Sequence, residues 1–214
     1  MSMRVAVFIS GRGSNLAALI GALRERPDAT VALVVSNRPD AGGVEVARRE
    51  GIPTAVLQSS AEPAEWLALL DQWRVDFVVL AGFLKQVPSR VVQRFAGRII
   101  NIHPALLPKY GGPGMYGLHV HRAVLAGGDA ESGATVHLVT ERYDEGPVLG
   151  QARVPVLPGD TPESLAQRVL AAEHRLLPAA VLAAAPSGTA VPFVLTDAKP
   201  APFAQRPTPN ATHP

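Results

Sequence analysis

Asn101 and His103 are the residues whose types and spacing most directly suggest chemistry. They stand two apart at the end of the apolar run Ile99–Ile102, so in a β-strand their side chains would share one face. Pro104 then restricts His103 to extended geometry and turns the chain away. An amide donor beside an imidazole can stabilise an oxyanion and transfer a proton, as acyl transfer requires. The alternative is a structural pair bonded only to loop backbone.

A carboxylate that could accompany this imidazole follows later in the chain. Asp144 stands in the acidic turn 140–147, between two apolar segments, and could point inward. Because turns commonly carry Asp and Gly, an exposed hairpin is the alternative.

The remaining histidines do not suggest a metal site. His119 and His121 are two apart on a predicted helix, so their rings would point apart, whereas metal binding on a helix favours side chains one turn apart. His137 lies in a predicted strand and is interpreted as a hydrogen-bonded core histidine. We therefore expect no bound metal.

The segment Ser10–Asn15 has the composition of a phosphate-binding turn. It lies between a predicted strand and a predicted helix, and its two glycines allow the backbone to approach an anion closely. The backbone N–H groups of Gly13, Ser14 and Asn15 would then lie at the N-terminus of the helix, where the helix dipole favours negative charge. The alternative is a tight turn capped by the side chain of Ser14 or Asn15.

This turn fits a single phosphate better than a dinucleotide. The dinucleotide pattern requires a third glycine, and Leu16 occupies that place. The second predicted strand is followed by Arg38 rather than by an acid that could bind a ribose diol. An NADPH enzyme in which Arg38 binds a 2′-phosphate remains an alternative.

The elements that must position these residues alternate between strand and helix. Continuous apolar runs predict buried strands at 4–9, 31–35, 54–57, 77–80 and 99–102. Helical spacing of apolar residues predicts helices at 14–23, 44–49 and 66–73. The sequence therefore predicts an α/β fold with a mostly parallel, twisted, Rossmann-like sheet and helices on both faces.

The second half of the chain has a different rhythm. A long loop rich in proline and glycine is expected over 103–117. Apolar spacing then predicts a helix at 119–125 and two strands at 134–139 and 148–156. These strands, joined by the acidic turn, would add antiparallel pairing to the sheet. A last helix begins after the hydroxyl cap Thr161, and Pro178 is expected to kink or end it.

We interpret residues 1–197 as a single domain. It consists of a phosphate-binding half at about 1–100 and a catalytic half at about 101–197. After that point the chain is rich in Pro, Ala and Thr and shows no periodicity, so 198–214 is predicted to be a disordered tail.

Composition narrows the class of protein. The chain has 214 residues, of which 47% are apolar and 18% charged, as expected for a domain with a sizeable core. A net charge of +2 without long basic runs argues against nucleic-acid binding. The absence of cysteine excludes thiolate catalysis and iron–sulfur clusters. The apolar runs are strand-sized, so no membrane helix or signal peptide is expected, and we predict a cytoplasmic protein.

Taken together, these segments resemble the phosphoribosylglycinamide formyltransferase family. The matching segments follow the family's order over about residues 4–195: Ser10-Gly-x-Gly-Ser-Asn-Leu16, Leu80-Ala-Gly-Phe83, Asn101-Ile-His-Pro-x-Leu-Leu-Pro-Lys-Tyr110, Gly133-x-Thr-Val-His137, Asp144-x-Gly-Pro147 and Glu173-His174. Their shared order and similar spacings make the resemblance specific.

The resemblance implies that the formyl group of 10-formyltetrahydrofolate is transferred to the amine of glycinamide ribonucleotide in purine biosynthesis. It implies no metal and no covalent enzyme intermediate. Asn101 would stabilise the tetrahedral oxyanion, and His103 would act in proton transfer. Asp144 would pair with His103 and raise its pKa, because an adjacent negative charge favours the imidazolium.

The resemblance also implies the binding residues. The backbone of Gly13, Ser14 and Asn15 would hold the 5′-phosphate of the nucleotide, and Glu173 would bind its ribose. The folate site would be lined by Leu84, Lys85, Gln86, Val87, Asn101 and the loop 140–144. The expected partners are therefore these two small molecules, without nucleic acid or membrane, and the protein would act as a monomer or homodimer.

Three alternatives come from related or different classes. Methionyl-tRNA formyltransferase adds a basic C-terminal domain, and formyltetrahydrofolate hydrolase adds a regulatory domain before the catalytic one; neither addition is expected here. The turn Ser10–Asn15 also favours a nucleotide acceptor. A non-catalytic nucleotide-binding module would leave Asn101, His103 and Asp144 without roles.

Overall fold

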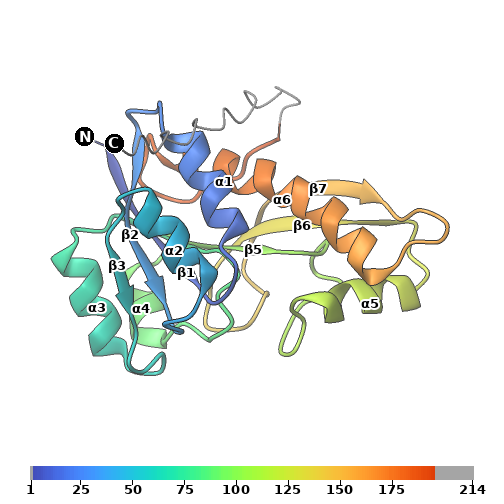
Figure 1. Cartoon of the computed structure of the whole chain (residues 1–214), viewed down its shortest axis with the longest axis horizontal. Helices are drawn as coiled ribbons and strands as arrows, with labels where there is room; N and C mark the ends of the chain where they lie inside the picture. The colour runs from blue at the N-terminus through green and yellow to red at the C-terminus, as the bar shows by residue number, and fades with distance from the viewer. Residues whose placement is uncertain (1, 196–214) are drawn as a thin grey trace, which may run out of the picture.

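The computed structural model describes residues 2–195 of the chain (Figure 1). The predicted tail at 198–214 lies outside the described residues. A seven-stranded sheet forms the centre of the molecule, with the strand order β3-β2-β1-β4-β5-β6-β7. The strands are β1 (Met3–Ile9), β2 (Ala29–Ser36), β3 (Thr54–Val56), β4 (Phe77–Leu80), β5 (Ile99–His103), β6 (Glu131–Leu138) and β7 (Val148–Pro155).

The five strands β3, β2, β1, β4 and β5 pair in parallel with their neighbours in that order. The strands β6 and β7 are added at the β5 edge by antiparallel pairing. This arrangement confirms the predicted mostly parallel sheet with an antiparallel addition. The central strands β1 and β4 are buried along almost their whole length, because their near-continuous apolar runs meet helices on both faces. Within residues 2–195, no helix is long and apolar enough to cross a membrane.

Helices cover both faces of the sheet, as predicted (Figure 1). One face carries α1 (Ser14–Leu23), α2 (Gly42–Arg49), α5 (Leu118–Ala126) and α6 (Pro162–Ala184), and the other carries α3 (Pro63–Gln72) and α4 (Ser89–Arg94). On the second face, Phe8 of β1 stacks on Trp66 of α3 with ring centroids 4.2 Å apart. Phe83, in the loop after β4, packs edge-on against both rings and so holds that loop near the end of β1.

Two helices differ from the sequence-based expectation. The helix α4 was not predicted, because its six residues are too few to show a helical period. The helix α6 continues through Pro178 to Ala184, so of the two predicted outcomes, a kink or an end, the helix does not end there. Proline removes one backbone hydrogen bond, but Leu177 and Val181 around it are fully buried in the core, and this packing keeps the helix continuous.

The loops that position the candidate site all follow the carboxyl ends of strands. The chain crosses from one side of β1 to the other between β3 and β4, so the loops after β1 and β4 diverge at a topological switch point. After β5, the predicted long loop is present, and no helix or strand interrupts residues 104–117. These three loops meet at one edge of the sheet.

Candidate active site

The antiparallel pairing of β5 with β6 gathers polar side chains on one face. Asn101 and His103 lie in β5, and their partners across the ladder are His137 and Thr135 of β6. Residues two apart on a strand share a face, and so do residues directly opposite each other. The four side chains therefore lie together at the end of β5.

His103 is buried, with only 3% of its surface exposed. Its Nε2 lies 2.8 Å from the carbonyl oxygen of Tyr110. Because a carbonyl can only accept, Nε2 carries the proton and Nδ1 carries the lone pair of the neutral ring. The Nδ1 atom lies 3.5 Å from Oδ2 of Asp144, so the position at which His103 can take up a proton faces a carboxylate.

Asp144 points into the molecule from a strained turn. Its φ of 56° lies in the left-handed region, which non-glycine residues rarely occupy. Its Oδ2 accepts a hydrogen bond from the backbone N–H of Gly112 at 2.8 Å, and its Oδ1 lies 3.3 Å from Nε2 of His137. Gly111 permits this approach, since a Cβ there would lie 3.1 Å from the Cβ of Asp144.

Burial decides the ionisation of this pair. Burial lowers the pKa of His103 and outweighs the charge of Asp144 and the carbonyl of Tyr110, which both raise it. Asp144 thus favours the charged form of His103, as expected, but burial leaves the pKa of His103 below its ordinary value. Burial acting alone would raise the pKa of Asp144, but the hydrogen bond with His137, the charge of His103 and the N–H of Gly112 together lower it. The site can thus combine a neutral imidazole with an ionised carboxylate.

His137 was interpreted from the sequence as a core residue, and the structure places it in the site. Its Nδ1 lies 3.0 Å from the carbonyl of Leu138 and therefore carries a proton. Its Nε2 lies 3.0 Å from Nδ2 of Asn101. In the neutral ring Nε2 accepts from the Asn101 amide, whereas in the charged ring it donates to Asp144. Only the strand register, which the sequence does not show, reveals this position.

Thr135 fixes the chain that follows His103. Its hydroxyl donates to the carbonyl of Ala105 at 2.6 Å and accepts from the N–H of Leu107 at 3.1 Å. The side-chain amide of Gln151 on β7 also donates to this hydroxyl at 3.0 Å. Such a fully bonded buried group limits how far the start of the loop can move.

The turn Ser10–Asn15 joins β1 to α1 as predicted. Gly13 precedes the helix with a φ of 80°, and no side chain caps the helix. The suggested cap by Ser14 or Asn15 is therefore absent from this turn. Since the first intrahelical bond runs from the N–H of Ala17 to the carbonyl of Gly13, earlier N–H groups have no acceptor within the helix. They provide donors of the kind that bind phosphate.

Gly13 is required by two features of this turn. Its positive φ is a conformation that a side chain disfavours, and a Cβ would collide with the backbone of Gly43 at the start of α2. Gly43 also donates its N–H to the carbonyl of Gly11 at 3.1 Å. This contact between two glycines, which supports the turn, depends on tertiary packing and has no signal in the sequence.

Glu173 on α6 faces the start of α1. It is 7% exposed, and its Oε2 accepts a hydrogen bond from Nδ2 of Asn15 at 2.5 Å. Burial raises the pKa of Glu173 to about 7, although the hydrogen bond from Asn15 acts in the opposite direction. The sequence placed Glu173 at the edge of a buried stripe, and the structure shows it buried with one polar partner.

One cavity of about 270 Å³ connects these groups. The predicted site residues that line it are Asn15, Leu84, Asn101, His103, Asp144 and Glu173. The glycine-rich loop 111–117 forms another wall of the cavity. Leu84, Tyr116 and Tyr143 expose apolar surface along it, as a site for an organic ligand would.

The other predicted site residues do not line this cavity: Gly13, Ser14, Lys85, Gln86 and Val87. Val87 is buried in the core on the α3 side of the sheet. Gln86 donates to the carbonyl of Glu141 at 3.0 Å and so connects the loop after β4 with the acidic turn. Ser10 supports the same loop, since its hydroxyl accepts from the N–H of Leu84 at 2.9 Å.

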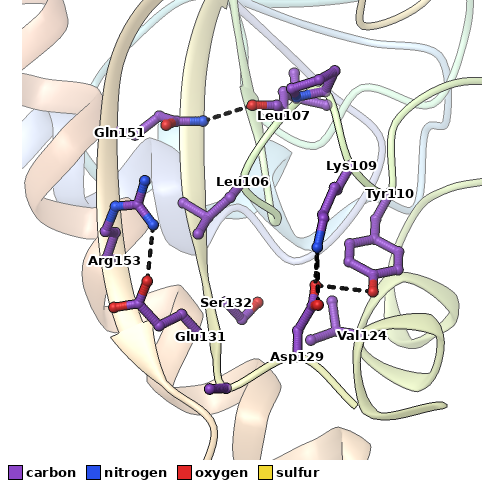
Figure 2. Close-up of a pocket in the computed structure, with 12 residues that line it drawn as sticks. Leu106, Leu107, Lys109, Tyr110, Val124, Asp129, Glu131, Ser132, Gln151 and Arg153 are labelled. Carbon is purple, nitrogen blue, oxygen red and sulfur yellow. Dashed lines mark hydrogen bonds and ion pairs between the residues drawn. The ribbon is translucent and has the colours of Figure 1, made fainter. Parts of the chain in front are cut away.

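A larger cavity of about 410 Å³ lies beside the loop after β5 (Figure 2). Ion pairs join Lys109 to Asp129 and Arg153 to Glu131 along its walls. None of the predicted site residues lines it. Because these charged side chains are paired with one another, we assign the chemistry to the smaller cavity. Within residues 2–195, no group of three or more His, Asp or Glu side chains could hold a metal ion.

Comparison with known proteins identifies the class to which this fold and site belong. The profile of the formyl transferase family matches residues 3–181, so the chain belongs to the formyl transferase family. It is 47% identical over 181 residues to "Phosphoribosylglycinamide formyltransferase, chloroplastic" of Arabidopsis thaliana, covering 81% of this chain and 62% of that protein. It is 44% identical over 183 residues to phosphoribosylglycinamide formyltransferase of Escherichia coli, covering 82% of this chain and 84% of that protein.

A solved structure gives the same result for the fold. The phosphoribosylglycinamide formyltransferase of Anaplasma phagocytophilum superimposes with a TM-score of 0.81 at 40% identity, covering 87% of this chain and 88% of that one. The resemblance identified from the sequence segments is thereby confirmed. The chain spans less than two thirds of the length of the Arabidopsis relative, 62%.

Proposed function

We propose that this protein transfers the formyl group of 10-formyltetrahydrofolate to the amine of glycinamide ribonucleotide, a reaction of purine biosynthesis. One observation carries the proposal: donors at the start of α1, the Glu173 carboxylate and the group of Asn101, His103 and Asp144 adjoin a single cavity. We further propose that residues 1–197 act as one formyltransferase domain.

The nucleotide would bind along the line from α1 to β5. The N–H groups of Gly13, Ser14 and Asn15 would donate to its 5′-phosphate, which the helix dipole also favours. Glu173 would accept hydroxyl groups of its ribose. These contacts leave the glycinamide amine near the end of β5, where Asn101 and His103 lie. The protein thus mainly supplies positioning, which can account for a large part of such a rate enhancement.

The folate would enter from the side of Leu84 and the acidic turn 140–144. Leu84 and Tyr143 offer apolar surface to its rings, and the bond from Gln86 to Glu141 keeps the two walls at a fixed separation. Lys85 is exposed and would attract the carboxylates of the folate tail. Val87 would support this wall from beneath. Asn101 would contact the formyl oxygen.

In the transfer itself, the amine nitrogen attacks the formyl carbon and a tetrahedral oxyanion forms. Asn101 would donate its amide N–H to this oxyanion. Nδ1 of neutral His103 would take the proton from the attacking nitrogen, and ionised Asp144 would stabilise the resulting imidazolium. The bond from the formyl carbon to N10 of the folate then breaks, and the same proton passes to N10. The two products, the formylated nucleotide and tetrahydrofolate, then leave the site, and His103 is neutral again.

A coupled assay tests the proposal. The protein is mixed with 10-formyltetrahydrofolate, with and without glycinamide ribonucleotide, and both tetrahydrofolate and the formylated nucleotide are quantified. We expect one equivalent of each product and dependence on the nucleotide. Folate deformylation at the same rate without nucleotide would indicate a hydrolase, and no turnover of either substrate would contradict the proposal.

A further inference from the structure

Tyr110 contacts the imidazole of His103 with its backbone and a second carboxylate with its side chain. Its carbonyl oxygen lies 2.8 Å from Nε2 of His103. Its hydroxyl donates to Oδ2 of Asp129 at 3.0 Å (Figure 2). Asp129 lies in the turn between α5 and β6 and does not line the candidate active-site cavity. Neither the hydroxyl nor Asp129 therefore takes part directly in the proposed transfer.

The backbone of Tyr110 has a conformation that requires support from its surroundings. Its φ of 57° lies in the left-handed region, which residues other than glycine rarely occupy. The far end of the ring supplies this support, since the hydroxyl is bonded to Asp129 and a Cβ at Gly127 would collide with the same hydroxyl. Anchoring the ring limits how far the backbone of Tyr110, and with it the carbonyl, can rotate.

Asp129 is a strong acceptor for this hydroxyl. Its carboxylate also accepts from Nζ of Lys109, at 2.9 and 3.1 Å for the two oxygens. The bonds from Lys109 and Tyr110 lower the pKa of Asp129, so the carboxylate is ionised at neutral pH. Because the Lys109 side chain is 66% exposed, its ion pair contributes little, and the bond from Tyr110 is the better anchor.

The carbonyl of Tyr110 determines which nitrogen of neutral His103 carries the proton. A carbonyl only accepts, so it selects the tautomer with the proton on Nε2 and leaves the lone pair on Nδ1. Asp144 acts in the opposite direction, because its carboxylate lies 3.5 Å from Nδ1 and would accept a proton-bearing Nδ1. In that second tautomer Nδ1 could not take the proton of the attacking amine. The position of the Tyr110 carbonyl therefore decides between a productive and an unproductive imidazole.

We propose that Tyr110 and Asp129 are positioning residues: the bond from the Tyr110 hydroxyl to Asp129 holds the Tyr110 carbonyl against Nε2 of His103, and this contact keeps Nδ1 free to act as the base. The consequence for turnover rests on the proposed function. The tautomer is a property of the protein alone and can be measured without substrates.

The tautomer is measured by ¹⁵N NMR of protein labelled in its histidines, at a mildly alkaline pH at which His103 is neutral. The shifts of the two ring nitrogens show which one is protonated, and the signals missing from His103→Gln identify the ring. The natural protein is expected to carry the proton on Nε2. Tyr110→Phe and Asp129→Ala should each transfer most of the population to the other tautomer, because Asp144 then remains as the acceptor beside the ring.

Steady-state formyl transfer gives the second measurement. In Tyr110→Phe and Asp129→Ala, kcat should fall about five- to tenfold, the effect of losing one hydrogen bond. KM for both substrates should stay unchanged, because neither side chain lines the candidate active-site cavity. Gly127→Ala displaces the same hydroxyl from the end of α5 and should give the same tautomer and the same loss of kcat.

Two variants of the same contacts serve as controls. Asp129→Asn keeps an oxygen that can accept from the Tyr110 hydroxyl, so it should retain the Nε2 tautomer and most of kcat. Lys109→Gln removes the other partner of Asp129 and leaves the hydroxyl bond in place, so it should behave like the natural protein.

A purely structural role for the anchor predicts a different result. Tyr110→Phe and Asp129→Ala would then be less stable to urea but would keep the natural tautomer and kcat, and this result would overturn the inference. A natural protein with the proton on Nδ1 would also overturn it, and that measurement needs no variant to fold. Absence of formyl transfer by the natural protein would instead contradict the proposed function, and the tautomer would still decide the positioning inference.

Discussion

The two oxygens of the Asp144 carboxylate have different partners. Oδ2 accepts from the N–H of Gly112 and faces His103, and Oδ1 faces His137. The side chain is only 9% exposed, so water replaces none of these contacts fully. Removing the carboxylate takes away the charge that would stabilise a protonated His103, and it takes away the acceptor for the N–H of Gly112. Removing one member of such a buried pair costs more stability than replacing both members by apolar groups, because the remaining polar group is left without a partner.

Replacement of His103 or Asp144 by Ala is expected to reduce kcat at least about 100-fold, because proton transfer loses its acceptor or the stabilising charge. Steady-state formyl transfer measures this, with circular dichroism to verify folding. Glu145→Ala provides a matched control, since Glu145 lies in the same turn but is exposed and pairs with Arg142, which is also exposed. Near-normal turnover of either site variant would contradict the assignment.

Glu173 should make nucleotide binding depend on pH. Its pKa of about 7 means that it becomes protonated as the pH falls through neutrality, and a protonated carboxyl is a poorer acceptor for ribose hydroxyls. We therefore expect KM for the nucleotide to rise as the pH is lowered below about 7. In Glu173→Gln, KM should be higher and independent of pH across this window. A pH-independent KM in the natural protein would contradict the prediction.

The same group affects the stability of the fold. Its folded-state pKa lies above the ordinary value for Glu, so its favourable contribution is complete at low pH and is lost as the pH rises toward 7. The variant Glu173→Gln cannot ionise at this position. Between pH 5 and 8 the natural protein should therefore lose about 1–3 kcal/mol more of its free energy of unfolding than the variant does. Urea unfolding at the two pH values measures the difference.

At the scale of the elements, strands were easier to predict than the contacts between them. The strands β1, β2, β4 and β5 are buried on both faces, and their continuous apolar composition is therefore enough to predict them. The end of α6 was not predictable locally, because tertiary packing around Pro178 outweighs a lost hydrogen bond. The site shows the same division. Asn101 and His103 could be found from their spacing on one strand, but His137 could not, since its neighbour depends on the register of two strands.

The turn between β1 and α1 should tolerate no side chain at Gly13. In Gly13→Ala, both the left-handed backbone and the contact with Gly43 are disturbed, and we expect a loss of about 3 kcal/mol in the free energy of unfolding. KM for the nucleotide should also rise, because the phosphate-binding N–H groups move. Urea unfolding and steady-state kinetics measure the two effects.

Gly51→Ala is the matched control for this change. Gly51 has a similar positive φ of 68°, but a Cβ there would meet nothing within 4 Å. Its replacement should cost only about 1 kcal/mol and leave KM unaltered. If the two variants behaved alike, the contact between Gly13 and Gly43 would have no part in nucleotide binding.

At the scale of the whole molecule, the candidate site joins segments that are distant in sequence. The hydrogen bond from Asn15 to Glu173 spans 158 positions, and the remaining groups come from β5, from the loops after β4 and β5 and from the acidic turn. The fold class and the order of these segments could be predicted, since each has a recognisable pattern. Their distances could not, because they depend on how α1, α6 and β6 pack around the sheet.

A ligand that bridges these segments should stabilise the entire fold. At 100 times its dissociation constant, the nucleotide is expected to add about 2.7 kcal/mol to the free energy of unfolding. For a chain of this length that corresponds to a rise in Tm of roughly 5–10 °C. Differential scanning calorimetry measures the shift, and Glu173→Gln at the same nucleotide concentration should show a smaller one. An unchanged Tm at saturation would contradict binding across the cavity.

The pairing of β5 with β6 makes activity a test of correct folding. The alignment that sets Asn101 opposite His137 also sets His103 opposite Thr135. A slip of a single residue would turn both β6 side chains toward the helices on the reverse side, and the ladder could still form. A misaligned protein would thus keep its secondary structure and lose its catalyst, so any selection that preserves turnover also preserves one alignment of these two strands.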